Sequence, residues 1–391
     1  FDGAECITSV DVSASRIGSN AFRNCSNMTS ATIGNSVTSI GGGAFFQCSI
    51  MESLNFNATN CTSMEEPFLY CPALTTIIIG NNVTNIPYSA FCGCNITSVT
   101  IPSSVTNIGD YAFKNCRRLT TINFNATNCN SMERSVWNEC SSLSTLNIGD
   151  NVTRVPDNAF YNCSGLAGTL FLPNSITSIG SYAFYNCNGL TGTLSIPNFI
   201  TSIGDFAFYG CAGLVGIDFN AINCTTMGSL WCPVFQSCTS LSTINIAENV
   251  INIPDYAFYK CTGISSIILP SSVSSIGKCA FKDCSSLNTV YFNATNCTVM
   301  GNPANPVFLN CSQFNNLSIG DNVVNIPAYS FYKCKELNSP QIPNSVLTIG
   351  DSAFYMVPNI VYSGSASGCP WGALSVNGYY EDGLFYTRMA K

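Results

Sequence analysis

One segment repeats about every 23 residues along the whole of this 391-residue chain. Each copy has an apolar strand-like run, a turn, a second short run and a tail that reads Ala-Phe-x-x-Cys or a close variant. The aromatic residue of the tail marks the copies at Phe22, Phe45, Phe68, Phe91, Phe113, Trp137, Phe160, Phe184, Phe208, Phe235, Phe258, Phe281, Phe308, Phe331 and Phe354. Successive marks are 22 to 24 residues apart, apart from two steps of 27 before Phe235 and Phe308. Such a short unbroken period predicts a solenoid, whose repeated faces most often bind a partner.

The apolar pattern within one copy predicts how the repeat folds. The residues expected in the core of the copy at 74–94 are Leu74, Ile77, Ile79, Val83, Ile86, Ala90, Phe91 and Cys94. The first three have the spacing of a short strand with one face buried, and the next pair returns to the core after a Gly-Asn-Asn turn. The last three lie at i, i+1 and i+4, which fits one turn of 3₁₀- or α-helix on the convex side. No single copy buries enough apolar surface to fold alone, so neighbours must stack.

Composition narrows the class of partner. Charged residues make up only 9% of the chain, against about 25% in a typical soluble protein, and the net charge is −7. A surface made mostly of hydroxyls and amides, with a small negative net charge, does not attract phosphate backbones. Nucleic acid is therefore not an expected partner. No apolar run reaches 18 residues, which argues against membrane insertion of this fragment. The chain starts at Phe1 without a leader, as expected for a processed, excised piece of an exported protein.

The chemistry of catalysis is missing from the sequence. The chain has no histidine, which removes the commonest general base and metal ligand. It also has no Gly-x-x-x-x-Gly-Lys phosphate loop and no Gly-x-Ser-x-Gly elbow. Ser-Lys or carboxylate-pair catalysis stays formally open, but the acidic residues are scattered. The sequence therefore predicts a protein that is not an enzyme, with no catalytic residues, no metal site and no cofactor.

Fourteen of the 23 cysteines occupy the same position of the repeat. They are Cys25, Cys48, Cys71, Cys94, Cys116, Cys140, Cys163, Cys187, Cys211, Cys238, Cys261, Cys284, Cys311 and Cys334. A stacked column gives each of them an equivalent neighbour on both sides, so no unique disulfide pairing follows. We expect most of this column to be reduced and buried, with cysteine acting as a small apolar residue. A local bridge from Cys92, Cys232 or Cys279, which lie off the column, is the alternative.

The repeat resembles the BspA-like subclass of leucine-rich repeats. The resemblance rests on the string Ile-Pro-x-Ser-Val-Thr-x-Ile-Gly-x-x-Ala-Phe-x-x-Cys at 101–116, its close copy at 175–187, and the agreement in spacing of fifteen copies. It implies an α/β leucine-rich-repeat solenoid, a right-handed horseshoe with a parallel concave sheet and about 15 repeats of about 23 residues. It also implies an extracellular or cell-surface location and adhesive binding to host or microbial surface proteins. The resemblance implies no catalytic residues.

The repeats define the expected domains. Residues 1–354 are expected to form the solenoid, and residues 355–391 a terminal cover or the start of a segment between blocks of repeats, which they resemble. A variant repeat with the string Phe-Asn-Ala-x-Asn-Cys begins at Phe56, Phe124, Phe219 and Phe292. We interpret it as a longer turn in which Cys and Met replace the usual core pair; lateral docking sites at these four turns are the alternative.

The residue between the two inward positions of each strand is expected to face solvent. We call these residues the outward row: Asp11, Thr32, Asn55, Ile78, Thr100, Asn123, Asn147, Phe171, Ser195, Asp218, Asn245, Ile268, Tyr291, Ser318 and Gln341. Small polar residues dominate the row, and four apolar members stand out. The predicted ligand-binding residues on this concave face are Ile78, Thr100, Asn123, Asn147, Phe171, Ser195, Ile268 and Tyr291. The alternative is that the apolar members only suit strand propensity and touch each other.

Positive charge gathers in two groups beside the Phe-x-x-Cys tail, around Lys114 to Arg154 and around Lys260 to Lys335. We interpret these residues as solvated charge, with a site for an anionic partner as the alternative. The leading functional hypothesis is a monomeric, non-enzymatic recognition or adhesion protein that binds an extracellular or cell-surface protein. A structural spacer that presents another domain, and a glycan-binding surface protein, are the alternatives.

Overall fold

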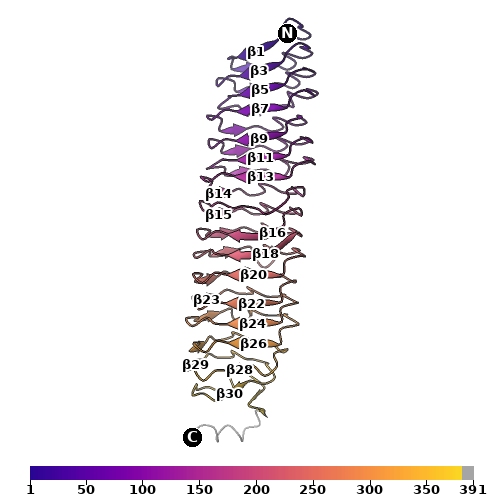
Figure 1. The fold of residues 1–391 in the computed structure, drawn as a ribbon. Helices are drawn as coiled ribbons and strands as arrows, with labels where there is room; N and C mark the ends of the chain where they lie inside the picture. Colours follow the sequence, from indigo (N-terminus) through magenta and orange to yellow (C-terminus); the bar gives the residue numbers. More distant parts are fainter. Residues whose placement is uncertain (381–391) are drawn as a thin grey trace. The chain divides into compact units, whose positions relative to one another are not determined.

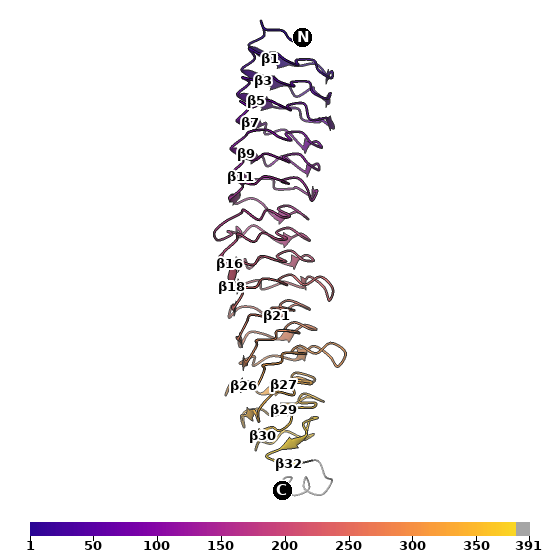
Figure 2. The ribbon, with the colours of Figure 1, turned by 90° about the vertical axis from the view of Figure 1, so that its right-hand side faces the viewer.

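The computed structural model describes residues 1–380 of the chain. They form a parallel-strand β-solenoid of about 15 turns, which divides into two compact units, Phe1–Leu190 and Thr191–Lys391. Most turns of the coil hold a long strand, usually of four residues, a short strand of two residues and a segment of linked turns around the Phe-x-x-Cys tail. We call that last part the turn segment. Long strands of successive repeats lie beside one another within each unit (Figures 1 and 2).

In the first unit the long strands form two parallel sheets, β1-β3-β5-β7 and β9-β11-β13. Their bounds are β1 (Ser9–Val12), β3 (Ser30–Ile33), β5 (Ser53–Phe56), β7 (Thr76–Ile79), β9 (Ser98–Ile101), β11 (Thr121–Phe124) and β13 (Thr145–Ile148). The short strands are β2 (Arg16–Ile17), β4 (Ser39–Ile40), β6 (Ser63–Met64), β8 (Asn85–Ile86), β10 (Asn107–Ile108), β12 (Ser131–Met132), β14 (Arg154–Val155) and β15 (Ser178–Ile179).

In the second unit the long strands form the sheets β16-β18-β20, β22-β24-β26 and β28-β30. Their bounds are β16 (Gly192–Ile196), β18 (Leu214–Phe219), β20 (Thr243–Ile246), β22 (Ser266–Leu269), β24 (Thr289–Phe292), β26 (Asn316–Ile319), β28 (Gln341–Ile342) and β30 (Val361–Tyr362). The short strands are β17 (Ser202–Ile203), β19 (Thr226–Met227), β21 (Asn252–Ile253), β23 (Ser275–Ile276), β25 (Val299–Met300), β27 (Asn325–Ile326) and β29 (Thr348–Ile349). Two further strands, β31 (Ser375–Val376) and β32 (Tyr379–Tyr380), pair antiparallel.

The breaks in the two ladders are staggered. The long-strand ladder is broken between β7 and β9, where the short strands β8 and β10 remain paired. The short-strand ladder is broken after β6, where the long strands β5 and β7 remain paired. The same exchange recurs in the second unit, where β21 pairs with β23 across the break between β20 and β22. One paired ladder therefore joins the two repeats on either side of each of these breaks.

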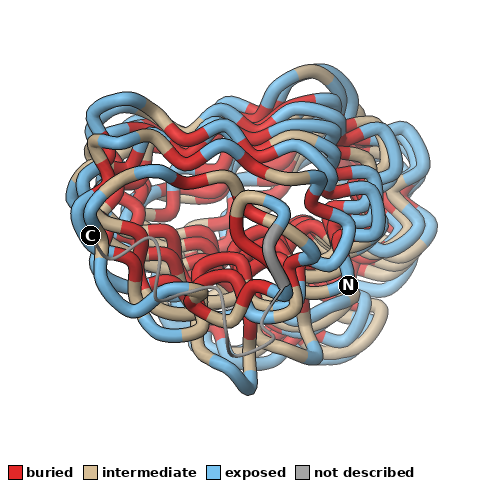
Figure 3. Tube along the Cα trace, turned by 90° about the horizontal axis from the view of Figure 1, so that it is seen from below, coloured by how far each residue is buried: buried red, intermediate tan, exposed pale blue. Residues whose placement is uncertain are grey.

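The core lies inside the coil and follows the predicted positions. All eight core positions predicted for the repeat at 74–94 are buried. Buried residues line the inside of the turns and exposed residues the outside (Figure 3). The column aromatics stack on one another, with ring centroids 5.2 Å apart for Phe22 and Phe45 and 4.7 Å apart for Phe113 and Trp137. In the variant repeats Cys61 and Met64 are buried, and Met64 pairs with Ile40, as expected for a substituted core pair.

The predicted helical turn at Ala90, Phe91 and Cys94 is wrong. The described residues contain no helix, so the α/β class is not supported and these residues form a β-solenoid. Amides in the turn segment alternate between two kinds of partner. Phe91 N–H donates to the carbonyl of Ala112 in the next repeat (2.7 Å), whereas Cys92 N–H donates back to Ser89 (3.3 Å). A helix would send every amide back along its own chain, whereas here half of them join neighbouring repeats.

Left-handed residues make this alternation possible. In most repeats the residues two before and two after the column aromatic have positive φ, as at Asn158 (57°) and Asn162 (58°) around Phe160. Asparagine and glycine tolerate this conformation, and they hold many of these positions. Tyr182 (58°) and Tyr256 (60°) hold others. The turn segment is therefore a chain of linked turns.

Within the described residues, the region after Phe354 continues the coil and is followed by the β31–β32 hairpin. β30 pairs parallel with β28, and Phe354 N–H donates to the carbonyl of Trp371 (3.1 Å). The boundary predicted at 354/355 stays a prediction, and part of the predicted segment 355–391 lies outside the described residues, namely 381–391.

Candidate functional site

The outward row faces solvent along the long strands, as predicted. Each of its members is exposed or half-buried, whereas the strand neighbours of Ile78, namely Ile77 and Ile79, are buried. Register pairs place consecutive members side by side: Asn55 opposite Ile78, and Asn123 between Thr100 and Asn147. Because side chains alternate between the two faces of a strand, the members of the outward row point away from the core. Binding by them stays a prediction.

Polar members of the row are linked by hydrogen bonds in the first unit. Asn147 Nδ2 donates to Asn123 Oδ1 (2.8 Å), and Asn123 Nδ2 donates to Thr100 Oγ1 (3.3 Å). These amides and hydroxyls are thus held in place by neighbouring repeats and keep further capacity for a partner, because an amide has two donors and two acceptor lone pairs.

A similar arrangement recurs in the second unit. Ser195, Asp218 and Asn245 are register neighbours, and Asn245 Nδ2 donates to Asp218 Oδ1 (2.7 Å). Farther along, Ile268 lies opposite Tyr291. The row in this unit therefore combines a polar stretch with an apolar pair.

The four apolar members of the row are well exposed. Phe171 is 69% exposed, Ile78 56%, Ile268 55% and Tyr291 42%. Only Ile268 and Tyr291 are register partners, so mutual packing across strands accounts for one pair. Phe171 lies in residues 168–172, where the only pairing within the first unit is an isolated bridge from Gly168 to Leu190. Within the first unit, no strand partner accounts for the exposed aromatic at Phe171.

Tyrosine rings and the cationic groups of Lys and Arg form cation–π contacts on the turn segment, which the sequence analysis did not predict. Arg134 Cζ lies 4.6 Å from the ring centroid of Tyr182, and Lys114 Nζ lies 4.8 Å from that of Tyr111. Other members of the positive groups form ion pairs, such as Arg154 with Asp157 (3.6 Å). These local contacts favour the interpretation as structural surface charge. The signal for them was the recurrence of tyrosine two residues before or one after the column aromatic.

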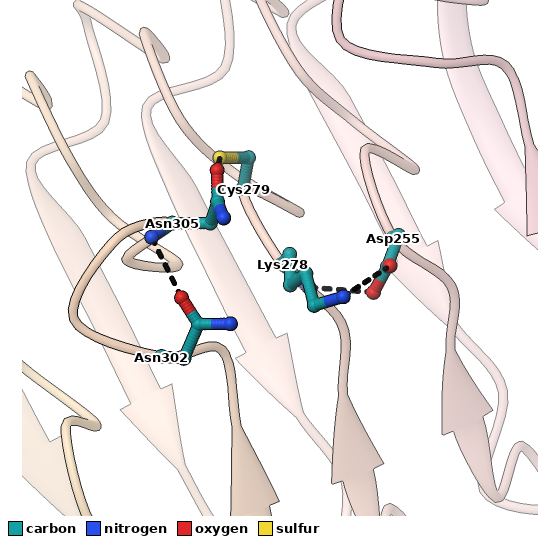
Figure 4. A network of polar contacts seen from close by, with 5 residues as sticks. All are labelled: Asp255, Lys278, Cys279, Asn302 and Asn305. Carbon is teal, nitrogen blue, oxygen red and sulfur yellow. Dashed lines mark hydrogen bonds and ion pairs between the residues drawn. The ribbon is translucent and has the colours of Figure 1, made fainter.

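Figure 4 shows how the turn segments of three successive repeats connect in the second unit. Asp255 Oδ1 accepts the Lys278 backbone N–H (2.7 Å), and Asp255 Oδ2 lies 3.8 Å from Lys278 Nζ. Cys279 Sγ lies 3.8 Å from Asn305 Oδ1, and the Asn305 N–H donates to Asn302 Oδ1 (2.9 Å). The 27-residue repeat that contains Asn302 and Asn305 therefore closes over Cys279, which is buried. The arrangement joins neighbouring repeats.

The cysteine column is buried at every position except the half-buried Cys140. Thiols in the column donate to the carbonyl of the preceding column aromatic, as in Cys48 to Phe22 (3.1 Å) and Cys311 to Phe281 (3.1 Å). Burial raises the pKa of the Cys238 thiol to about 12. The Cys238 thiol is therefore held protonated in the core, an environment that makes it a poor nucleophile. The redox state of the cysteine column stays a prediction.

Residues 1–380 hold no group of three or more His, Cys, Asp and Glu side chains that could bind a metal ion. Across the same residues no helix has the length and apolar composition of a membrane span. The chemistry of the outward row is that of hydrogen bonding and apolar contact.

Comparison with solved structures finds other leucine-rich repeat proteins. One from Bacteroides ovatus has 27% sequence identity over 79% of this chain and 86% of its own, with a TM-score of 0.49. A leucine-rich cell surface protein from Faecalibacterium prausnitzii has 23% identity over 80% of this chain and 88% of its own, with a TM-score of 0.32. No curated protein matches the chain.

The family model described as the BspA type leucine rich repeat region (6 copies) matches residues 1–119, 64–191, 167–288 and 229–361. These overlapping matches leave no gap between residues 1 and 361. They agree with the buried columns and the stacked parallel strands described above. The chain belongs to the BspA-type leucine-rich repeat family.

Proposed function

We propose that the chain is a non-enzymatic recognition protein of the extracellular space or cell surface, and that it binds host or microbial surface proteins through the outward row. Leucine-rich repeats of this family are scaffolds for protein interaction. The family resemblance and a surface built of uncharged amides and hydroxyls support this location. The protein acts as a monomer in this proposal.

The observation that carries the proposal is the composition of the outward row. In the first unit the row holds hydrogen-bonded Asn and Thr side chains and the exposed Phe171. In the second unit it holds the hydrogen bond from Asn245 to Asp218 and the exposed Tyr291. Aromatic side chains with few rotamers are the usual energetic anchors of protein interfaces, while ordered polar neighbours supply specificity. A row that served only as a spacer has no need of a 69% exposed phenylalanine.

The absence of histidine and the raised pKa of the buried Cys238 thiol support a non-enzymatic role. The acidic side chains that form hydrogen bonds do so largely with the backbone or side chains of neighbouring repeats, as Asp255 and Asp218 do. Such groups hold repeats together and are not placed around a shared reaction centre.

The test is a binding screen of the purified chain against immobilised extracellular-matrix proteins, namely collagens, laminin and fibronectin. For a partner found in this way, Phe171→Ala and Tyr291→Ala should each weaken binding by roughly 1 to 3 kcal/mol, or about 5- to 150-fold. Phe199→Ala is the matched control, because Phe199 is 58% exposed and lies outside the row. Equal effects of all three substitutions would contradict the proposed surface.

A further inference from the structure

The long-strand ladder breaks wherever a proline directly follows the next strand. β9, β22 and β28 are each the first strand after a break, and they are followed by Pro102, Pro270 and Pro343. Strands inside a ladder are followed instead by residues with an N–H group. That N–H donates to the last carbonyl of the previous strand, as in Asn57 to Ile33 and Gly80 to Phe56 (both 2.8 Å).

Proline explains the break because it has no N–H to donate. At the break between β7 and β9, Pro102 occupies the position from which Gly80 donates one repeat earlier, so the Ile79 carbonyl receives no such bond. No backbone hydrogen bond joins β7 to β9 among the described residues, although the short strands of the same repeats stay paired. The gap is therefore local to the long strands.

The backbone groups that face this gap can be identified from the hydrogen bonds that join β7 to β5 and β9 to β11. Alternate residues of a parallel strand bond to alternate neighbours. Thr76 and Gly80 donate to the strand before β7, so the backbone groups of Ile77 and Ile79 point toward β9. The N–H and C=O groups of Ser98 and Thr100 likewise point toward β7. Donors and acceptors alternate along both walls, and none has a partner across the gap.

A cavity of about 330 Å³ occupies this gap. Its polar lining includes the side chains of Thr76, Asn81, Ser98 and Thr100, its apolar wall includes Ile78, and none of its lining residues is charged. A volume above about 300 Å³ is enough for a small ligand. In the second unit, the break between β26 and β28 has a polar cavity of about 550 Å³ with Asn316, Ser318 and Gln341 in its lining. The same proline pattern thus accompanies a polar cavity in each unit.

We propose that the gap between β7 and β9 is a binding site for a neutral sugar residue of a glycan. A sugar hydroxyl both donates and accepts hydrogen bonds, which matches walls on which N–H, C=O and hydroxyl groups alternate. The apolar C–H face of a sugar ring has a counterpart in Ile78, which is 56% exposed. A charged ligand would lose solvent without gaining a counter-ion here, so a neutral one is favoured.

The width of the gap rules against an inserted peptide strand. A strand between β7 and β9 would separate them by about 9.6 Å, twice the usual spacing of about 4.8 Å. Residues on the two strands still have Cα atoms within 8 Å of each other. The site therefore suits a small polyhydroxyl unit at the surface of the sheet. This inference does not depend on protein binding by the outward row.

The test is methyl NMR of the isoleucine side chains during titration with maltotetraose, cellotetraose and lacto-N-neotetraose. The methyl signal of Ile78 should shift and saturate with at least one of these sugars, at a dissociation constant of about 1 mM or tighter. Ile122, buried in the continuous ladder of β11, is the internal control and should not move. Sialyllactose is the charged probe, and it should shift Ile78 at least about 10-fold more weakly.

Two variants connect binding to the gap itself. Pro102→Asn restores the N–H found at Asn57, so it should close the ladder, slow amide hydrogen exchange at Ser98 and Thr100, and abolish the sugar shift. Thr76→Val/Ser98→Val replaces two hydroxyls with methyl groups and adds one further methyl at residue 98, and it should weaken binding at least about 10-fold. This double variant decides the matter if Pro102→Asn does not fold. Ser53→Val, in the paired strand β5, is the control and should bind the sugar normally.

Several outcomes would overturn the inference. The first is an unmoved Ile78 signal with all three neutral sugars at 20 mM, about 20 times the expected dissociation constant. The second is unchanged sugar binding in a folded Pro102→Asn or Thr76→Val/Ser98→Val variant. The third is tighter binding of sialyllactose than of the neutral sugars. A chain that binds the sugar but no matrix protein supports this site and contradicts the proposed function. The reverse result removes only the sugar site.

Discussion

The column of aromatic residues inside the coil and the outward row on the long strands have the same period but opposite surroundings. Phe258 in the column is buried between Phe235 and Phe281, with ring centroids 6.3 and 5.4 Å away. Phe171 in the row is 69% exposed. The column varies little along the chain because every member packs against equivalent neighbours. The row varies from Asp218 to Tyr291 within paired strands, so it is the part of the repeat that is free to specify a partner.

The largest expected effect comes from truncating the column. Phe258→Ala should lower the free energy of unfolding by about 3 to 5 kcal/mol, because it removes stacked contacts in a core that cannot fully collapse. Phe171→Ala should change it by less than about 0.5 kcal/mol. Urea unfolding of both variants followed by circular dichroism measures the difference. Similar losses for the two variants would remove the distinction between column and row.

Alkaline pH should weaken the column through its thiols. Burial raises the pKa of Cys238 from 9.0 to about 12. Below pH 9 the thiol is protonated in both states, and between pH 9 and 12 it ionises only when unfolded. Stability is therefore lost in that window by up to about 1.4 kcal/mol per pH unit for such a thiol.

Urea unfolding of the native chain and of Cys238→Ala under reducing conditions, from pH 8 to pH 11, isolates this contribution. The stability advantage of the native chain over the variant should shrink as the pH rises above 9. A constant difference across the range would show that the thiol titrates alike in both states.

A smaller effect is expected in the turn segment. Asn162 has a φ of 58°, which a β-branched residue adopts at a cost of about 1 to 2 kcal/mol. Asn162→Val should therefore lower the free energy of unfolding by about that amount. Asn162→Gly is the matched control, because it also loses the hydrogen bond from Asn186 but keeps the backbone unstrained. Equal stability of the two variants, measured by urea unfolding, would contradict the role assigned to the left-handed residues.

The smallest stability effect is expected in the row. Asn147→Ala removes the 2.8 Å hydrogen bond to Asn123, which is solvent-exposed, so the loss should be about 0.5 to 1 kcal/mol. Thermal unfolding of Asn147→Ala beside the native chain measures it. A loss above about 2 kcal/mol would mean that the row is part of the folding core.

Much of the repeat could be predicted from the sequence because its period is strict. The buried positions from Leu74 to Cys94 and the exposed direction of the outward row both follow from spacing alone. The turn segment was predicted incorrectly, since Ala90, Phe91 and Cys94 at i, i+1 and i+4 point inward equally well in a helical turn and in linked turns. The chain forms linked turns and not a helix, because residues such as Asn20 and Asn24 adopt positive φ values.

The breaks in the long-strand ladder could not be predicted from the sequence, for a different reason. The position of Pro102 is visible in the sequence, but a single repeat does not show which carbonyl of the neighbouring repeat loses its donor. The same limit applies to the Asn-Ala-x-Asn-Cys repeats. There the Cys61 carbonyl accepts the side-chain amide of Asn85 in the next repeat (2.8 Å). Features that depend on pairs of repeats appear only once the register is known.

The central claim is that recognition lies in the outward row and folding in the column. The most direct measurement compares partner affinity and melting temperature for the double variant Phe171→Ala/Tyr291→Ala and for the control Phe199→Ala, using a matrix protein that binds the native chain. The account predicts at least a 10-fold loss of affinity in the double variant only, with both melting temperatures within about 2 °C of the native chain. Unaltered affinity in the double variant, or a fall in its melting temperature large enough to explain the loss, would contradict the claim.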